Sequence, residues 1–312
     1  MNNSNAVTLY SLKSIAVAIF ASIVYLAISL LLIGFKTDQL FLVFIFNTCY
    51  FFNEQSRKFI TGFSIFICYW ILFDLMKAFP NYQFNTVHIA DLYNAEKIVF
   101  GIPLNGRIAT PNEYWLNHPS VFFDIMSGIF YLCWVPVPLA FAFYLFLKDK
   151  KLFLYFSLTF VLVNLIGFVI YYIYPAAPPW YFQQHGSAFI KDTPGNTAGL
   201  IKFDQYTGLS VFQNIYAKSS NVFAAMPSLH SAYPLVVLYY AFKKSVSSFL
   251  KFVFTIVMLG IWFSAVYTSH HYVLDVIAGI ICAIIGIIIF NKLLLSVAWF
   301  QRFIKGFILK IE

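Results

Sequence analysis

The sequence has few charged residues, and this shortage indicates its class. Only 10% of its 312 residues are Asp, Glu, Lys or Arg, whereas 61% are hydrophobic and the mean hydropathy is +0.78. A soluble domain of this length carries a far larger charged and polar fraction. Long apolar runs with few charges are instead typical of transmembrane helices. The composition excludes an ordinary soluble protein and predicts an all-α, polytopic membrane protein.

Cysteine is also scarce, and its positions exclude two further classes. The four cysteines, Cys49, Cys68, Cys133 and Cys282, lie inside apolar runs without metal-type spacing, so neither a disulfide framework nor a structural zinc site is expected. The net charge of +8 comes from basic residues scattered near the expected helix ends, which does not indicate a nucleic-acid partner. The first apolar run has no small-residue cleavage site and is interpreted as a retained helix.

The apolar runs predict about eight transmembrane helices, because about 20 residues cross the hydrocarbon core. These runs lie near 14–35, 38–53, 59–79, 120–146, 152–174, 224–242, 249–268 and 270–291. The second run is short and contains Asn47, so it is expected to be tilted, internal or only partly spanning. Pro136 and Pro138 predict a kink in the fourth. The densest basic clusters fall on one side, which predicts that both termini are cytoplasmic.

The runs divide the chain into four parts. Residues 1–80 are expected to form N-terminal transmembrane helices, 81–119 an outer loop, 120–292 a transmembrane core with a second outer loop over 175–223, and 293–312 a cytoplasmic amphipathic tail. Long ordered loops in a compact protein usually cover a functional site. The carboxylates placed within spans, Asp74, Asp124 and Asp275, all fall near the outer ends. We therefore expect an active site on the outer face, periplasmic or lumenal.

Two polar motifs lie where an outer loop enters an apolar helix: Pro227, Ser228 and His230, and then His271 and Asp275. Ionisable residues in or near a membrane are costly and are functional candidates. On a helix, His271 and Asp275 would share one face, and the carboxylate would orient the imidazole as a nucleophile. Pro227 is expected in the first turn of a helix, where it is tolerated because the N–H groups of that turn have no partner inside the helix. Those free N–H groups suit a phosphate, with the Ser228 hydroxyl nearby.

This layout suits phosphoryl transfer by double displacement, with neither a metal nor a cofactor. His271 would attack phosphorus to form a phosphohistidine, and His230 would protonate the leaving oxygen and then deprotonate the acceptor. Three alternatives stay open: histidines that only pack, a metal site of His230, His271 and Asp275, and a transporter, whose charges would reach mid-depth. His270 would point about 100° away from His271 on a helix and is expected to be a neighbour only.

At these motifs the sequence resembles the type 2 phosphatidic acid phosphatase superfamily, whose signatures are Pro-Ser-x-His and His-x-x-x-Asp. The resemblance implies that Ser228 binds phosphate, that His230 is the general acid, and that His271 is the nucleophile oriented by Asp275. Two cationic signatures of the family are missing here, since Ser264 is followed by Ala265 and no basic residue lies between Tyr171 and Pro179. The candidates to replace these cations are Lys77, Arg107 and Lys218.

Within this superfamily, the second outer loop resembles fungal inositol phosphorylceramide synthases over about residues 170–280. The matching residues are Pro178, Pro179, Trp180, Tyr181, Gly199, Leu200, Asp204, Gly208, Ser219, Ser220 and Phe223. The resemblance implies transfer of phosphoinositol from phosphatidylinositol to ceramide or dihydroceramide. A membrane lipid phosphatase with water as acceptor shares the same catalytic residues and is the alternative. Trp180, Tyr181 and Asp74 are candidate substrate contacts, although the first two are also typical interfacial anchors and Asp74 can simply pair with Lys77.

Overall fold

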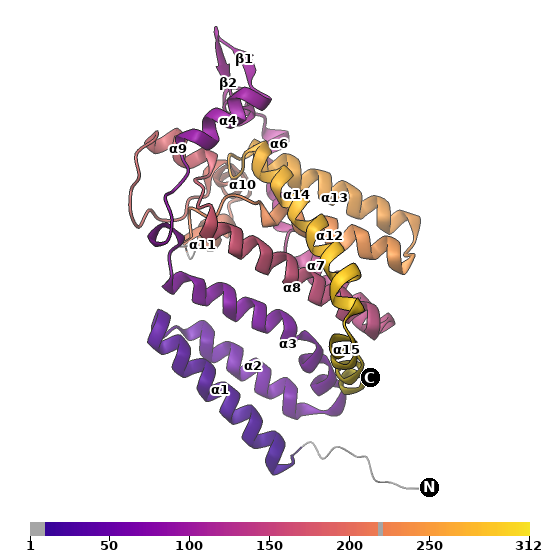
Figure 1. Cartoon of the computed structure of the whole chain (residues 1–312). Helices are drawn as coiled ribbons and strands as arrows, with labels where there is room; N and C mark the ends of the chain where they lie inside the picture. Colours follow the sequence, from indigo (N-terminus) through magenta and orange to yellow (C-terminus); the bar gives the residue numbers. More distant parts are fainter. Residues whose placement is uncertain (1–9, 218–220) are drawn as a thin grey trace.

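The computed structural model describes residues 10–217 and 221–312, which are helical almost throughout (Figure 1). Lys218, Ser219 and Ser220 lie outside the described residues. The long helices run roughly side by side, with most of the short outer elements gathered at one end and α15 (Ala298–Ile311) at the other (Figure 1). The predicted all-α class is confirmed; the described strands are one short hairpin, β1 (Ile102–Leu104) with β2 (Arg107–Ala109).

Six helical segments are long and apolar enough to cross a membrane, and they coincide with six of the predicted spans. They are Leu12–Ile33, Glu54–Ala78, Val121–Lys148, Lys150–Ile173, Ser248–Tyr267 and Val273–Ser296. The other two predicted spans are the 16-residue helices α2 (Thr37–Phe52) and α12 (Leu229–Lys244). At 1.5 Å per residue, these two are shorter than a full crossing of about 30 Å. The chain is an integral membrane protein, and among the described residues six helices are long and apolar enough to span. The predicted count of about eight is not confirmed.

The kink predicted from the two prolines is confirmed as a break between two helices. The helix α6 (Val121–Leu132) ends before Cys133, and α7 (Pro136–Lys148) begins with Pro136 at its first position. Proline is well tolerated there because its missing N–H would have no partner inside the helix.

The centre of the bundle is α8 (Lys150–Ile173), which buries twelve residues, whereas α1 (Leu12–Ile33) buries two. The helices α12 and α14 (Val273–Ile288) pack beside α8 and each other, and α13 (Ser248–Tyr267) packs on α12 and α6. On the other side of α8, α3 (Glu54–Leu75) carries α1 and α2 (Figure 1). After the turns η4 (Ile289–Leu293) and η5 (Leu294–Ser296), α15 packs on α3 and α8.

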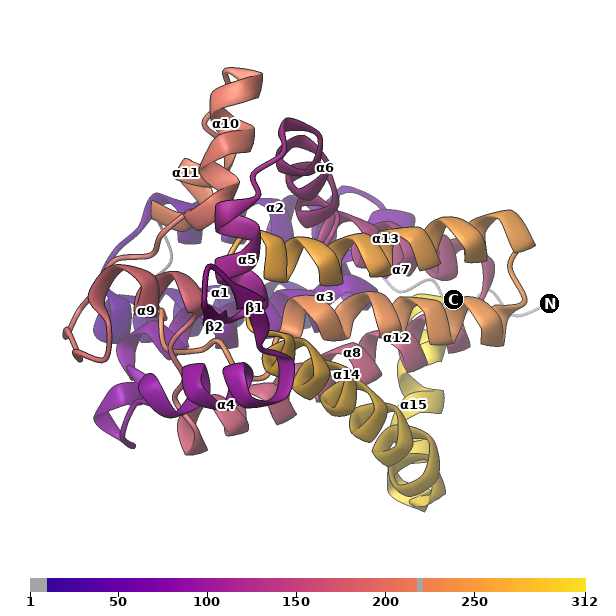
Figure 2. The ribbon, with the colours of Figure 1, turned by 90° about the horizontal axis from the view of Figure 1, so that it is seen from above.

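The outer segments fold into short elements. The first follows η1 (Met76–Ala78), which ends the N-terminal helices, and contains η2 (Asn81–Gln83), α4 (Ala90–Phe100), the hairpin and α5 (Pro111–Asn117). The second contains α9 (Pro179–His185), η3 (Ala198–Leu200), α10 (Ile201–Thr207) and α11 (Val211–Ala217). Figure 2, seen from above, shows α4, α5 and α9 spread over the ends of the core helices.

Three extended stretches join the two outer segments. The His88 N–H donates to Pro175 O (2.8 Å), the Ala176 N–H to Phe223 O (2.8 Å) and the Ala225 N–H to Ala176 O (3.2 Å). This pairing carries the chain to Ala225 at the edge of the candidate site.

Candidate active site

His271 lies in the turn between α13 and α14, so the predicted helical pairing with Asp275 is wrong. The helix α14 begins only at Val273, three residues after the predicted start at residue 270, and Asp275 Oδ2 caps it by accepting the Tyr272 N–H (2.8 Å). The His271 N–H is bonded to Ala265 O (2.9 Å), which turns the chain before the helix. The two side chains are nevertheless close, with His271 Nδ1 3.7 Å from Asp275 Oδ2.

The His271 imidazole is buried and has a defined tautomer. Its Nδ1–H donates to the carbonyl of Ala225 (3.0 Å), which leaves Nε2 with a free lone pair. Burial lowers the pKa of His271 from 6.5 to about 4, although the bond to Ala225 partly offsets this shift. His271 is therefore neutral at neutral pH, as a nitrogen nucleophile must be.

His230 is the second residue of α12, whose N-cap is Ser228. The expectation that Pro227 lies in the first turn is wrong by two positions, because serine is a preferred N-cap and Ser228 Oγ accepts the Ser231 N–H (3.4 Å). The Ser228 N–H donates to Asp275 O (2.9 Å), which ties the two motifs together. Gly279 touches this junction, since a Cβ there would lie 2.1 Å from Ser228 O. Only glycine therefore lets α14 approach Ser228 this closely.

The two histidines face each other directly. His230 Nδ1 is 3.2 Å from His271 Nε2 and 3.1 Å from the Tyr131 hydroxyl, and the Trp134 ring packs edge-on against the His230 ring. Because His271 Nε2 carries the lone pair, the hydrogen of this contact belongs to His230 Nδ1. An attacking nitrogen needs about 3–3.5 Å to the reacting atom, and an acid needs about 2.6–3.2 Å to the leaving oxygen. A phosphate between the two rings must therefore push them apart.

The arrangement does not support the metal alternative. Asp275 approaches the Nδ1 edge of His271, whereas His230 faces the opposite, Nε2 edge. The three side chains do not converge on one point, and residues 10–217 and 221–312 contain no group of three His, Cys, Asp or Glu side chains suited to hold a metal ion.

His270 lies in the same turn and points elsewhere. Its ring stacks on Tyr131 and Tyr216, and its Nε2–H donates to Thr197 O (2.9 Å). The predicted separation from the Asp275 side of His271 is present, but it arises from the turn and not from helical geometry. His270 anchors the second outer segment.

The other predicted contacts lie away from the histidines or inside the outer segments. Asp74 and Lys77 form an ion pair (2.7 Å), and no hydrogen bond or ion pair joins either of them to His230 or His271 within the described chain. Arg107 approaches Glu113 (3.8 Å).

Trp180 and Tyr181 are both buried, and they take part in the packing of the second outer segment. The Trp180 N–H donates to Ser269 O (3.0 Å). The Tyr181 hydroxyl donates to Ala188 O (3.0 Å) and accepts the Ile190 N–H (2.8 Å). Their direct role in substrate binding stays a prediction.

Two polar residues of the first outer segment hold the His271 turn, and sequence reasoning missed them. Asn112 Nδ2 donates to Val266 O (2.7 Å) and His271 O (2.9 Å). Glu96 accepts the N–H groups of Val273 (2.9 Å) and Leu274 (3.1 Å). Both side chains are fully buried. In the sequence, Glu96 and Asn112 are only an acid and an amide in a polar loop. No motif spacing links either residue to His271.

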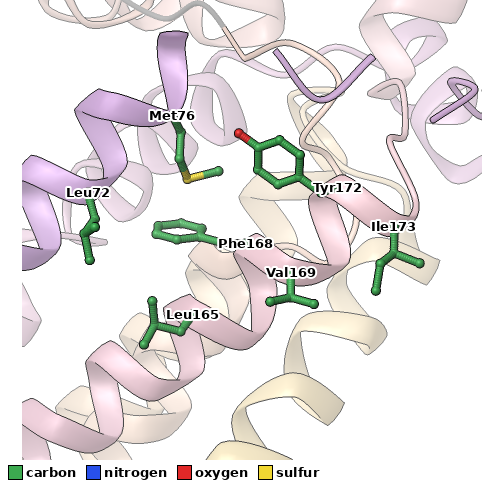
Figure 3. Close-up of a pocket in the computed structure, with 7 residues that line it drawn as sticks. All are labelled: Leu72, Met76, Leu165, Phe168, Val169, Tyr172 and Ile173. Atoms are coloured by element: carbon green, nitrogen blue, oxygen red, sulfur yellow. The ribbon is translucent and has the colours of Figure 1, made fainter. Parts of the chain in front are cut away.

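Two apolar grooves open on the sides of the bundle. One, of about 440 Å³, lies between α3 and α8, where Figure 3 shows Leu72, Met76 and Phe168 among seven apolar or aromatic lining residues. The other, of about 250 Å³, lies between α8 and α14 and reaches Met226 and Pro227, directly before Ser228. The second groove adjoins the loop that supports the His271 site.

Residues 104–289 match the PAP2 superfamily. The chain belongs to the PAP2 superfamily. It is 43% identical over 286 residues to a phosphoinositol dihydroceramide synthase of Bacteroides thetaiotaomicron, covering 90% of this chain and 94% of that protein. It is 27% identical to an inositol phosphorylceramide synthase of Candida albicans, covering 79% of this chain but 54% of the longer relative. No solved structure matches the chain.

These similarities confirm the predicted resemblance to the inositol phosphorylceramide synthase-like branch of the PAP2 superfamily. They also confirm the prediction of a membrane-embedded enzyme, because the relatives are named as synthases of lipids. The similarity to the bacterial synthase covers 90% of the chain, so it includes most of the residues before 104 that the family match leaves out.

Proposed function

We propose that this protein transfers phosphoinositol from phosphatidylinositol to ceramide or dihydroceramide, releasing diacylglycerol, on the outer face of the membrane. The observation that carries the proposal is the neutral, buried His271 Nε2 facing His230 Nδ1, in a chain similar over most of its length to a phosphoinositol dihydroceramide synthase. The outer face and cytoplasmic termini are supported by the outer segments, which cover the catalytic end (Figure 1), and by the basic clusters at the other end.

In the first half of the reaction, His271 Nε2 attacks the phosphorus of phosphatidylinositol. The new N–P bond forms as the bond from phosphorus to the diacylglycerol oxygen breaks. His230, in its imidazolium form, gives its Nδ1 proton to that oxygen and becomes neutral. His271 then carries positive charge, which the Asp275 carboxylate at 3.7 Å stabilises.

In the second half, the roles of His230 reverse. The ceramide hydroxyl gives its proton to His230 Nδ1, its oxygen attacks phosphorus, and the N–P bond breaks to return neutral His271. The first turn of α12, capped by Ser228, supplies N–H groups beside His230 for the phosphate oxygens. Lys77 stays a candidate phosphate ligand, with Asp74, Trp180 and Tyr181 as candidate substrate contacts.

The test is to incubate the purified protein with labelled phosphatidylinositol, with and without ceramide, and to identify the products. We expect slow turnover alone and much faster turnover with ceramide, giving diacylglycerol and a new phosphoinositol lipid. Free inositol phosphate as the main product despite saturating ceramide would support a lipid phosphatase instead.

The same assay tests metal dependence. Because the proposed nucleophile is a histidine and the phosphate site is a helix N-terminus, a chelator should leave the rate almost unchanged. Activity that disappears with chelator and returns with zinc would contradict the mechanism.

A further inference from the structure

The N-terminus of α14 is held by a carboxylate from a distant part of the chain. Helix ends leave the first N–H groups without partners inside the helix. In α14, Asp275 takes the N–H of the N-cap Tyr272, and Glu96 takes the next two, with Oε1 on Val273 N (2.9 Å) and Oε2 on Leu274 N (3.1 Å). Glu96 belongs to α4, 177 residues before Val273, and its side chain is fully buried.

We propose that Glu96 is a positioning residue for phosphotransfer, which fixes the first turn of α14 and so sets the place of His271 and Asp275. The inference rests on the proposed function for the identity of the nucleophile. Asp275 is the third residue of α14, and its 3.7 Å approach to His271 Nδ1 depends on where this turn lies. Without the two hydrogen bonds from Glu96, the first turn of α14 would move. Asp275 would then shift, and His271 Nε2 would no longer face His230 Nδ1.

The ionised form of Glu96 is the one that serves both N–H groups. Burial raises the pKa of Glu96 from 4.5 to about 7; the bonds to Val273 and Leu274 oppose the rise, and nearby Asp275 adds to it. The other titratable groups around this end of α14 are Tyr272, Tyr93 of α4 and Glu113 of α5. His271, with a pKa of about 4, is neutral around pH 7, where Glu96 titrates.

Activity and stability should therefore respond to pH in opposite directions. The folded pKa of Glu96 lies above its ordinary value, so its contribution to stability is greatest below pH 4.5 and is lost as pH rises through about 7. The positioning of His271 and Asp275 improves as pH rises through the same interval, because the ionised carboxylate of Glu96 accepts both N–H groups and a protonated carboxyl group accepts them poorly. We therefore expect the rate to fall as the pH is lowered, with the midpoint of this acid limb near pH 7.

The decisive variant is Glu96→Gln in the full-length protein. Its single amide oxygen can accept one N–H, while its NH₂ group opposes the other. Losing one hydrogen bond to a charged group costs about 1.5–3 kcal/mol, so we expect kcat at pH 8 to fall roughly tenfold or more. KM for both lipids should stay within about twofold, and the acid limb should disappear.

Two further variants separate positioning from folding. Asp91→Asn changes a half-exposed acid of the same helix that pairs with His88 and makes no bond to α14, so it should keep the wild-type rate and pH profile. Val273→Pro removes one of the N–H donors at the first helical position, where proline is tolerated after the extended Tyr272. In that background Glu96→Gln should cost clearly less than in the wild type.

An unchanged kcat with the acid limb retained in Glu96→Gln would overturn the proposal. So would full additivity with Val273→Pro, because the two changes would then act independently. If the proposed acceptor lipid is wrong, the wild type and Glu96→Gln will both give the same unexpected product. The ratio of their two rates then still tests the role of Glu96.

Discussion

The N-terminal layer of α1–α3 and the core around α8, α12 and α14 are similarly apolar in sequence, yet they differ in how polar groups are held. In the N-terminal layer the one predicted functional pair, Asp74 with Lys77, is a contact between residues three apart. In the core, Glu96, Asn112 and Ala225 reach the His271 turn from positions far away in the chain. Buried hydrogen bonds between distant segments, and not charge in a span, distinguish the catalytic region from the helices beside it.

The largest expected effect is that of His271→Ala. It should abolish turnover and the trapping of a phosphohistidine, because no other side chain within residues 10–217 and 221–312 places a free nitrogen opposite His230. The measurement is product formation together with labelling of the protein by phosphatidylinositol carrying labelled phosphate. Substantial residual activity would show that the double-displacement scheme is wrong.

Asp275→Asn should come next. The change keeps the shape and one acceptor for the Tyr272 N–H but removes the charge beside His271 Nδ1. By analogy with the loss of a triad carboxylate, we expect the rate to fall by about 10⁴ while protein abundance stays near normal. Purified yield and single-turnover rates provide the comparison, and a loss of less than tenfold would mean that Asp275 serves only as a helix cap.

His270→Ala should have a much smaller effect. The variant loses the bond to Thr197 and the stacking on Tyr131 and Tyr216, but it leaves the His230–His271 contact intact. We expect it to keep most of the activity, with a loss below about tenfold and a lower thermal midpoint, since a lost hydrogen bond costs about 1 kcal/mol. A loss equal to that of His271→Ala would assign His270 to the chemistry.

The smallest expected effect is that of Lys77→Gln in the N-terminal layer. The ammonium of Lys77 is already paired with Asp74, and such partly exposed pairs contribute about 0–1 kcal/mol. We expect kcat and KM within about twofold of wild type. A hundredfold loss would instead identify Lys77 as the phosphate ligand predicted from the sequence. The N-terminal layer would then contribute to catalysis as the core does.

Some features of the site were predictable because they depend on local chemistry. The apolar runs, the proline break before α7 and the position of the polar motifs near helix ends follow from residue type and period. The His271–Asp275 register was not predictable in the same way. Four-residue spacing indicates a helical pair, but Asp275 caps α14 and the Ala265 carbonyl holds His271 in a turn before it.

The sequence by itself determined that this is a helical membrane enzyme and that it resembles the lipid phosphotransferases of the PAP2 superfamily. It also predicted His230, His271 and Asp275 as the residues that carry the chemistry. Only the tertiary structure decided which nitrogen of His271 is free, which atom of His230 faces it, and that Glu96 and Asn112 hold the turn between them. Membrane insertion and helix period depend on neighbours along the chain. Hydrogen-bond direction depends on atoms that folding brings together from distant segments, and a single sequence does not encode their distances.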